Sequence, residues 1–312
     1  LFSEKIQELK DRIASVIVGQ EQTVDLVLTA ILANGHVLIE GVPGVAKTLL
    51  ARLTARLIDA DFSRVQFTPD LMPSDVLGTT VFNMKTNAFD FHQGPIFADI
   101  VLVDEINRAP AKTQAALFEV MEERQISIDG TTHRMGDLYT ILATQNPVEQ
   151  EGTYKLPEAQ LDRFLMKITM DYPSLEEEVN ILERHHTNAA LVKLDDITPA
   201  ITKEELLSLR AFMNQVFVDR TLLQYIALIV QQTRTSKAVY LGASPRASVA
   251  MLQSSKAYAL LQGRDFVTPE DIKFVAPYVL QHRLILTAEA EMEGYSPVKV
   301  TQRLIDKVEV PK

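Results

Sequence analysis

The stretch "HVLIEGVPGVAKTLLARLTARLI" places an apolar segment, a glycine-containing loop and a helical segment in direct succession. The apolar segment, residues 36–40, has the length and composition of a short buried strand. The loop "GVPGVAKT", residues 41–48, follows the phosphate-loop pattern G-x-x-x-x-G-K-[ST] except at Ala46, where the pattern has glycine. In the order strand, loop, helix, this pattern predicts a nucleotide-phosphate site; a Gly-Pro turn beside a surface lysine is the alternative.

Each part of the loop has a physical role at such a site. The backbone N–H groups of residues 44–48 can line an anion, and the N-terminus of the following helix adds positive potential. Lys47 can reach the β- and γ-phosphates, and the Thr48 hydroxyl can ligate Mg²⁺. Ala46 keeps its N–H, so no donor is lost. Because a left-handed backbone at Ala46 would cost roughly 1–2 kcal/mol, we expect a negative, helix-like φ there.

Further apolar segments alternate with helical ones along the first part of the chain. They lie at residues 64–67, 100–105, 139–144 and 165–170. Strands without polar alternation predict a parallel sheet covered by helices on both faces. After Tyr172 the pattern changes, residues 187–200 resemble a linker without a helical stripe, and from "TKEELLSL" (202–209) onward only helical periodicity remains. We therefore expect an α/β core at residues 1–190, followed by an all-α domain at residues 191–312.

Two stretches of the core fit neither the sheet nor the helices. "VFNMKTNAFDFHQG" (81–94) alternates weakly around a Lys-Thr-Asn turn. "RQISIDGTTHRM" (124–135) has an Asp-Gly turn behind Ile126 and Ile128, which is a stronger hairpin signal. Both stretches therefore predict β-hairpins inserted into the core.

Two carboxylates end one of the predicted strands, in "DIVLVDEINR" (99–108). In open α/β sheets, ligands bind beyond the carboxyl ends of the strands. Asp104 would there hold the water shell of Mg²⁺, and Glu105 would polarise an attacking water. An ordinary strand-to-helix turn is the alternative. Asn146 follows another strand, where its amide can orient the same water or simply begin an Asn-Pro turn.

Two arginines stand at positions that suit an external anion. Arg163 lies in "LDRF", just before the last predicted strand of the sheet; a solvated arginine paired with Asp162 is the alternative. In "GASPRA", Ser244 and Pro245 predict a helix start, so that Arg246 falls in the first turn. A cation there opposes the helix dipole, which favours acidic residues at that end, and this hints at a bound anion.

Composition excludes several classes of protein. The chain has no cysteine, which excludes a disulfide framework and thiolate metal sites and fits a cytoplasmic protein. The net charge of −10 and the lack of a long basic stripe argue against a primary nucleic-acid binder. No apolar run approaches the ~20 residues that span a bilayer. The six histidines show no ligand spacing, so we expect no structural metal.

Taken together, these motifs resemble the AAA+ ATPases, and most closely the MoxR family. "GVPGVAKT" resembles the Walker A loop, "LVDE" Walker B, "ATQNP" sensor 1 at Asn146, and "SPRA" sensor 2 at Arg246. "LDRF" resembles the segment whose arginine, here Arg163, reaches a neighbouring subunit's nucleotide. "IVGQE" resembles the segment near the adenine. By this resemblance the nucleotide contacts are Val18, Gly19, Gln20, Gly41, Gly44, Val45, Ala46, Lys47, Thr48 and Leu49.

The resemblance also implies properties that the residues alone do not indicate. These are a sheet ordered 5-1-4-3-2, a helical lid, ATP and Mg²⁺ as ligands, and assembly into a ring that is usually hexameric. The hairpins at 81–94 and 124–135 match the places where this group of ATPases carries inserts. MoxR-type proteins are thought to act as chaperones that mature a protein client, often with a von Willebrand factor A-domain protein. The resemblance therefore implies ATP-driven remodelling of a partner protein.

Three other functions share parts of this pattern. A magnesium-chelatase-like subunit has the same core. A DNA-remodelling ATPase is disfavoured by the acidic charge. A nucleotide-binding switch without turnover is disfavoured by Glu105, because a pure switch can dispense with a base.

Overall fold

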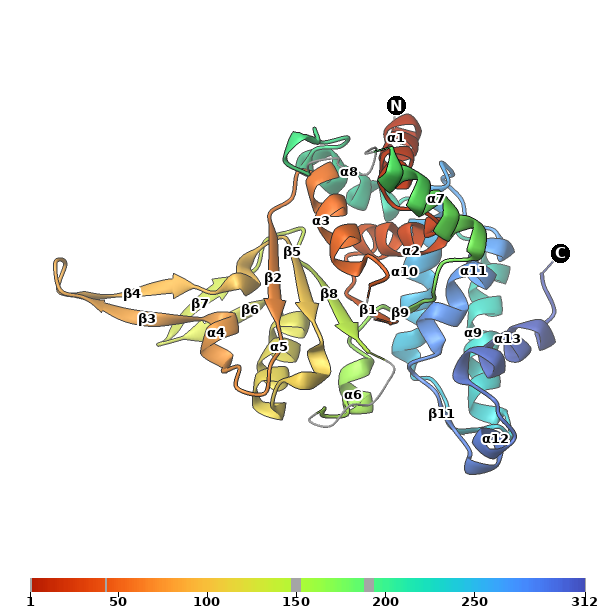
Figure 1. Ribbon diagram of the computed structural model, residues 1–312. Helices are drawn as coiled ribbons and strands as arrows, with labels where there is room; N and C mark the ends of the chain where they lie inside the picture. The colour runs from red at the N-terminus through yellow and green to blue at the C-terminus, as the bar shows by residue number, and fades with distance from the viewer. Residues whose placement is uncertain (1, 43, 147–152, 188–193, 312) are drawn as a thin grey trace.

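The structure is a computed structural model that describes residues 2–42, 44–146, 153–187 and 194–311 (Figure 1). Its centre is a five-stranded sheet in which every neighbouring pair is parallel. In spatial order the strands are β2 (Phe62–Gln66), β5 (Ile100–Asp104), β8 (Thr140–Gln145), β1 (Val37–Gly41) and β9 (Met166–Met170). Counted along the chain this is the order 5-1-4-3-2, so the sheet that the family resemblance implied is confirmed.

The sheet separates two hydrophobic clusters, because successive side chains of each strand point to opposite faces. On β5, Ile100 and Leu102 join one cluster while Val101 and Val103 join the other, and all four are fully buried. Strands buried on both faces have no reason to alternate polar and apolar residues, which is why they read as continuous apolar runs.

Helices cover both faces of the sheet. The first cluster includes α1 (Phe2–Val16), α2 (Glu21–Leu32) and α3 (Lys47–Leu57). The second includes α4 (Pro73–Leu77) and α5 (Ala111–Glu123). Short helical turns complete this part of the chain at η1 (Pro95–Phe97), η2 (Ile106–Arg108) and α6 (Glu158–Leu161).

Two antiparallel hairpins extend from the core, away from the C-terminal helices (Figure 1). One joins β3 (Gly78–Asn83) to β4 (Ala88–Gln93), and the other joins β6 (Gln125–Ile128) to β7 (Thr131–Arg134). Both predicted hairpins are thus present. They contact each other through the Thr80 hydroxyl, which donates to Asp129 Oδ2 at 2.6 Å, and through the rings of Phe91 and His133, whose centroids are 4.3 Å apart.

The C-terminal part is helical, as expected for a lid. The helix α7 (Leu175–His186) falls inside the range expected for the core. The elements in the range expected for the lid are η3 (Leu194–Asp196), α8 (Lys203–Met213), α9 (Arg220–Thr235), α10 (Pro245–Leu261), α11 (Pro269–Leu280), α12 (Ala288–Met292) and α13 (Pro297–Lys307). One short antiparallel ladder, β10 (Val239–Leu241) with β11 (Ile285–Leu286), was not anticipated, because strands this short carry no periodic signal. The expected domain boundary at 190 and much of the expected linker lie outside the described residues.

The lid is anchored to the core by charged side chains as well as by apolar packing. Arg210 of α8 is buried and donates to the carbonyl of Ile31, at the end of α2, through Nε at 2.9 Å and Nη2 at 2.6 Å. Lys203, also on α8, forms an ion pair of 2.6 Å with Asp99. Among the described helices, none has the length and apolar character needed to cross a membrane.

Two buried histidines predict how folding stability depends on pH. Burial lowers the pKa of His36 from 6.5 to about 3, with the Arg124 charge acting in the same direction, and burial also lowers the pKa of His282 well below 6.5. The unfolded chain protonates both rings as the pH falls below about 6.5, whereas the folded chain keeps them neutral. The contribution of each neutral ring to stability should therefore be complete above about pH 6.5 and be lost as the pH falls, toward about 3 for His36, by up to about 1.4 kcal/mol per pH unit for each histidine.

Denaturant unfolding at several pH values between about 7.5 and 5.5 measures this slope. His36→Gln should make the slope shallower, because glutamine does not titrate. Replacement of the exposed His185 by alanine is the matched control and should leave the slope unchanged. Equal slopes in the wild type and His36→Gln would contradict the prediction.

Candidate nucleotide site

The loop after β1 has the backbone of a phosphate-binding turn. Gly41 ends the strand where a side chain does not fit, because a Cβ there would lie 2.7 Å from the carbonyl oxygen of Met170. Gly44 has φ +90°, which favours glycine, and open space where a Cβ would stand. The helix α3 then begins at Lys47 without a side-chain cap, so its first backbone N–H groups remain suited to an external anion.

The expected negative φ at Ala46 is wrong. Its φ is +61° and its ψ is 23°, a left-handed conformation. The expectation assumed that Ala46 lies in the first helical turn, whereas Ala46 is the N-cap and the helix starts one residue later. The chain must reverse direction at this point for Lys47 to enter the helix, and this constraint outweighs a steric cost of roughly 1–2 kcal/mol.

Lys47 lies close to both carboxylates that the sequence singled out. Its Nζ donates to the carbonyl oxygen of Gly41 at 2.6 Å. Partial burial lowers the pKa of Lys47, while the negative charges of Asp104 and Glu105 oppose this shift. Asp104 ends β5 and Glu105 follows it, the lysine follows β1, and β8 separates these two strands in the sheet.

Asp104 ends β5 and is buried, with both of its carboxylate oxygens engaged. Oδ1 accepts from the Thr144 hydroxyl at 3.1 Å, and Oδ2 accepts from Arg64 Nε at 2.6 Å. Thr144 belongs to β8 and Arg64 to β2, so both strands that flank β5 fix this carboxylate. A side chain held so firmly can present an oxygen to the water shell of a metal ion with little loss of conformational entropy.

Glu105 follows directly and adopts a left-handed backbone, with φ 56°. Its N–H donates to Thr144 Oγ1 at 3.0 Å. Its Oε2 accepts from Gln66 Nε2 and from Arg108 Nη1, each at 2.9 Å. Left-handed backbone at a non-glycine residue often marks a functional site.

The remaining predicted contacts of the nucleotide lie around the same edge of the sheet or beside it. Asn146 follows β8 directly, and Thr48 and Leu49 lie in the first turn of α3. Val18, Gly19 and Gln20 connect α1 to α2. At Gly19, with φ +71°, a Cβ would lie 2.2 Å from Glu177 Oε1, so the N-terminus of α7 packs against this segment.

These residues fit a nucleoside triphosphate with magnesium. The uncapped helix start and Lys47 suit phosphate oxygens, and the Thr48 hydroxyl with Asp104 suits a hydrated Mg²⁺. Magnesium in such sites takes most of its ligands from water and phosphate, so few protein ligands are needed. Among the described residues, no group of three or more His, Cys, Asp or Glu is placed to hold a metal ion.

Arg163 and Arg246 lie at the opposite edge of the sheet. The N–H of Leu165, two residues after Arg163, donates at 2.8 Å to the carbonyl of His36, which precedes β1. The phosphate loop follows the other end of β1, roughly 13–16 Å away for a five-residue strand. Neither arginine is therefore grouped with Lys47, Asp104 and Glu105 within one chain.

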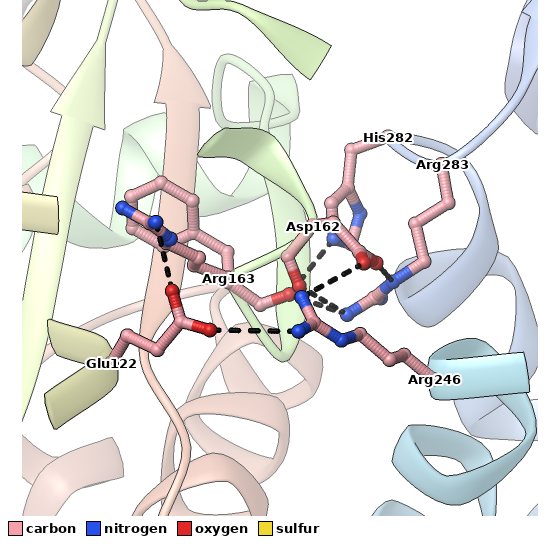
Figure 2. Close-up of polar contacts among 7 residues, drawn as sticks. Glu122, Asp162, Arg163, Arg246, His282 and Arg283 are labelled. Carbon is pink, nitrogen blue, oxygen red and sulfur yellow. Dashed lines mark hydrogen bonds and ion pairs between the residues drawn. The ribbon is translucent and has the colours of Figure 1, made fainter. Parts of the chain in front are cut away.

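A single carboxylate holds both arginines (Figure 2). Glu122, near the end of α5, pairs through Oε2 with Arg163 Nη2 at 2.8 Å and through Oε1 with Arg246 Nη2 at 3.5 Å. Arg246 also lies 3.9 Å from Asp162 Oδ2. The expected alternative partner of Arg163, Asp162, instead binds Arg246 and Arg283. The Arg163 and Glu122 side chains are 28% and 39% exposed, and surface pairs are worth about 0–1 kcal/mol, so an incoming phosphate can replace Glu122.

Several residues at these two edges were not identified from the sequence. Arg64 and Gln66 are polar residues at alternate positions of "RVQF", and this spacing on a strand end could have indicated a shared face toward the carboxylates. Arg108, Glu122 and Arg283 carry no comparable local signal, because their partners are set by the packing of separate elements.

Replacing Ala46 by glycine should stabilise the fold. Glycine adopts φ +61° without the steric cost of roughly 1–2 kcal/mol, but it loses about 0.5–1 kcal/mol of chain entropy on folding. The expected net gain is up to about 1.5 kcal/mol in the free energy of unfolding, measured with denaturant. Ala55→Gly, inside α3, is the control and should destabilise. A loss of stability in Ala46→Gly would contradict the strain argument.

Comparison with known proteins places this chain among ATPases. Residues 36–166 match the ATPase family associated with various cellular activities (AAA), and residues 231–306 match the AAA lid domain. The chain is 47% identical over 301 residues to the uncharacterized protein YeaC of Bacillus subtilis, covering 96% of this chain and 93% of that protein. It is 44% identical over 306 residues to Chaperone MoxR1 of Mycobacterium tuberculosis, covering 95% and 80%.

A more distant relative and a solved structure support the same family assignment. Protein MoxR of Methylorubrum extorquens is 31% identical over 303 residues, covering 90% of this chain and 87% of that protein. The crystal structure of a candidate ATPase from Cytophaga hutchinsonii superimposes with a TM-score of 0.91 at 41% identity, covering 100% of this chain and 96% of that one. The chain therefore belongs to the MoxR family of AAA+ ATPases.

Proposed function

We propose that this ATPase uses Mg²⁺-dependent hydrolysis of ATP to remodel a protein client, as one subunit of a ring. The observation that carries this proposal is the division of the predicted site between two edges of the sheet. Lys47, Asp104 and Glu105 gather beyond the carboxyl ends of the strands, whereas Arg163 and Arg246 share Glu122 at the other edge. A second copy of the chain, supplying its arginines, completes the site.

Within one subunit, the residues divide the chemistry of hydrolysis. Lys47 and the N-terminus of α3 bind the phosphates, and Thr48 with Asp104 holds Mg²⁺, which neutralises charge on the β- and γ-phosphates. Glu105 accepts a proton from the attacking water, and Asn146 orients that water. Gln66 and Arg108 hold the Glu105 carboxylate at 2.9 Å each, so a shift of β2 or η2 would change the direction of the base.

The arginine pair acts on the neighbouring subunit. A guanidinium that reaches the γ-phosphate stabilises the charge of the transition state. Arg163 and Arg246 come from the core and the lid, respectively, so an anion bound between them contacts both parts of one subunit (Figure 2). Because both carboxylate oxygens of Glu122 bind the pair, we infer that the two arginines act together. Because the pair lies at the edge of the sheet opposite to Lys47, we infer that it acts in trans.

The client is a protein, and the β3–β4 hairpin is the surface that we propose for it. Large apolar side chains are exposed on this ribbon, with Met84 88% and Phe89 73% accessible. Exposed apolar side chains at the end of a projecting element suit a protein partner. The relative named Chaperone MoxR1 supports a chaperone role. By family resemblance, a hexameric ring and a von Willebrand factor A-domain partner are the assembly and the client to test first.

Release of phosphate from ATP tests the hydrolytic part of the proposal. Lys47→Ala should lose nucleotide binding and turnover together, because the phosphates lose their cation. Glu105→Gln should bind ATP with wild-type affinity but release little phosphate, because an amide cannot accept the proton. Chelation of Mg²⁺ should abolish turnover in every variant. The exposed Lys299 and Glu289 provide the matched controls Lys299→Ala and Glu289→Gln. Equal, background rates in the wild type and both site variants would refute the function.

Substitutions of the two arginines are expected to slow ATP hydrolysis rather than to weaken ATP binding. Arg163→Ala should bind ATP normally and hydrolyse it up to about 10³–10⁵-fold more slowly, as for arginine fingers in related chemistry. Arg246→Ala should also slow hydrolysis. If the pair acts as a unit, the double variant should slow hydrolysis by less than the product of the two single fold-changes. Arg220→Ala, at an exposed arginine of α9, serves as the control. Unchanged turnover in Arg163→Ala would remove this residue from the site.

A further inference from the structure

The side chain of Arg283, in the lid, is buried and donates almost all of its hydrogen bonds to the core segment that carries Arg163. It lies in the turn between α11 and β11, and its side chain is only 5% exposed. Nε donates to Asp162 Oδ1 at 2.6 Å. Nη2 donates to the carbonyls of Asp162 at 3.1 Å and Phe164 at 2.8 Å. Nη1 donates to Leu165 at 3.1 Å and, within the lid, to Val279.

These contacts use the full donor capacity of a guanidinium. Its five N–H groups form a rigid planar fork, and five acceptors surround them here. The neighbouring His282 adds a bond from Nε2 to the Phe164 carbonyl at 3.0 Å. The backbone on both sides of Arg163 is thereby fixed by the lid, while the Arg163 side chain points away toward Glu122 (Figure 2).

The same contacts couple the two arginines of the predicted trans site. Asp162 receives Arg283 on Oδ1 at 2.6 Å and faces Arg246 through Oδ2 at 3.9 Å. Glu122 joins Arg246 to Arg163. A displacement of the α11–β11 turn therefore moves the Asp162 carboxylate, the backbone of Arg163 and the surroundings of Arg246 together.

We propose that Arg283 is a positioning residue for ATP hydrolysis, which holds the Asp162–Leu165 backbone so that Arg163 meets the nucleotide of the neighbouring subunit. This inference rests on the proposed trans action of Arg163. The lid would therefore set the position of Arg163 in its own subunit, and so control ATP hydrolysis at the nucleotide site of the neighbouring subunit. A misplacement of about 1 Å in a catalytic group can cost about 10²-fold in rate, so the effect is measurable.

The first variant is Arg283→Lys, which keeps the charge but replaces the five-donor fork by one ammonium group. Turnover should fall by about 10²-fold while the affinity for ATP stays within about twofold, because the phosphate loop of the same subunit is untouched. Asp162→Asn is the second variant, in case Arg283→Lys fails to fold. It keeps the shape of the side chain but removes the charge that binds Arg283, so a smaller fall in turnover is expected. Thermal unfolding monitors the folding of both.

A matched control exists elsewhere in the lid. Arg264 also binds an aspartate with two N–H groups, at 2.7 Å from Nη1 to Asp271 Oδ2 and 2.5 Å from Nη2 to Oδ1. Nη1 also donates to the carbonyl of Phe266, and both Phe266 and Asp271 lie within the lid. Arg264→Lys should lower thermal stability but leave turnover per folded subunit near the wild-type value.

Assemblies that mix two variants distinguish a role of Arg283 in positioning Arg163 from a general loosening of the lid. Glu105→Gln subunits cannot hydrolyse ATP but keep intact arginines, so they should restore turnover at the nucleotide sites of Arg283→Lys subunits when the two are mixed. Arg163→Ala mixed with Glu105→Gln is the reference pair. Restoration in both mixtures, with unchanged ATP affinity of Arg283→Lys, supports the inference.

Two results would overturn it, and they are distinguishable. If Glu105→Gln restores the Arg163→Ala sites but not the Arg283→Lys sites, or if Arg283→Lys loses ATP affinity in parallel with turnover, Arg283 is structural and only this inference fails. If the reference pair itself is not restored, Arg163 does not act in trans, and the proposed function fails together with the inference.

Discussion

The direction of the strands in one parallel sheet governs the arrangement of this protein. All carboxyl ends meet at one edge, so the phosphate loop after β1, the carboxylates after β5 and Asn146 after β8 come together without any long-range signal in the sequence. The same rule sends the beginnings of the strands to the other edge. There the segment before β9 meets the end of α5 and the start of the lid helix α10, and the two arginines proposed to reach a neighbouring nucleotide lie on a separate surface.

The physical character of the two edges differs. At the carboxyl edge, the buried Asp104 carboxylate is held by both neighbouring strands, so this group is fixed before any ligand arrives. At the other edge, Arg163 and Arg246 share the partly exposed carboxylate of Glu122, which water screens, and Arg246 also faces Asp162 at 3.9 Å. The first arrangement suits preorganised catalysis, and the second suits contacts that exchange when subunits meet.

The sequence predicted the strands, both hairpins and the placement of Lys47, Asp104 and Glu105 at the carboxyl edge, because each depends on local pattern and on where a strand ends; the roles of these residues in hydrolysis stay predictions. The order of the sheet came from the family resemblance, since periodicity says nothing about which strands pair. The backbone of Ala46 was predicted wrongly, because a local steric preference of roughly 1–2 kcal/mol is smaller than the constraint that the loop places on Lys47. The roles of Glu122 and Arg283 could not be predicted, because both contact residues far away in the chain, through packing of α5 and the lid against the segment before β9.

The two hairpins have a mechanical consequence. A lone two-stranded ribbon is marginally stable in water and bends easily. Here the Thr80–Asp129 bond and the contact between Phe91 and His133 brace one ribbon against the other, which makes the pair stiffer than either alone. The long ribbon is six residues per strand, or roughly 20 Å at a rise of about 3.3 Å per residue. A stiff arm of that length works as a lever: a tilt of about 10° at its root, which joins β2 through α4, carries the tip through roughly 3–4 Å.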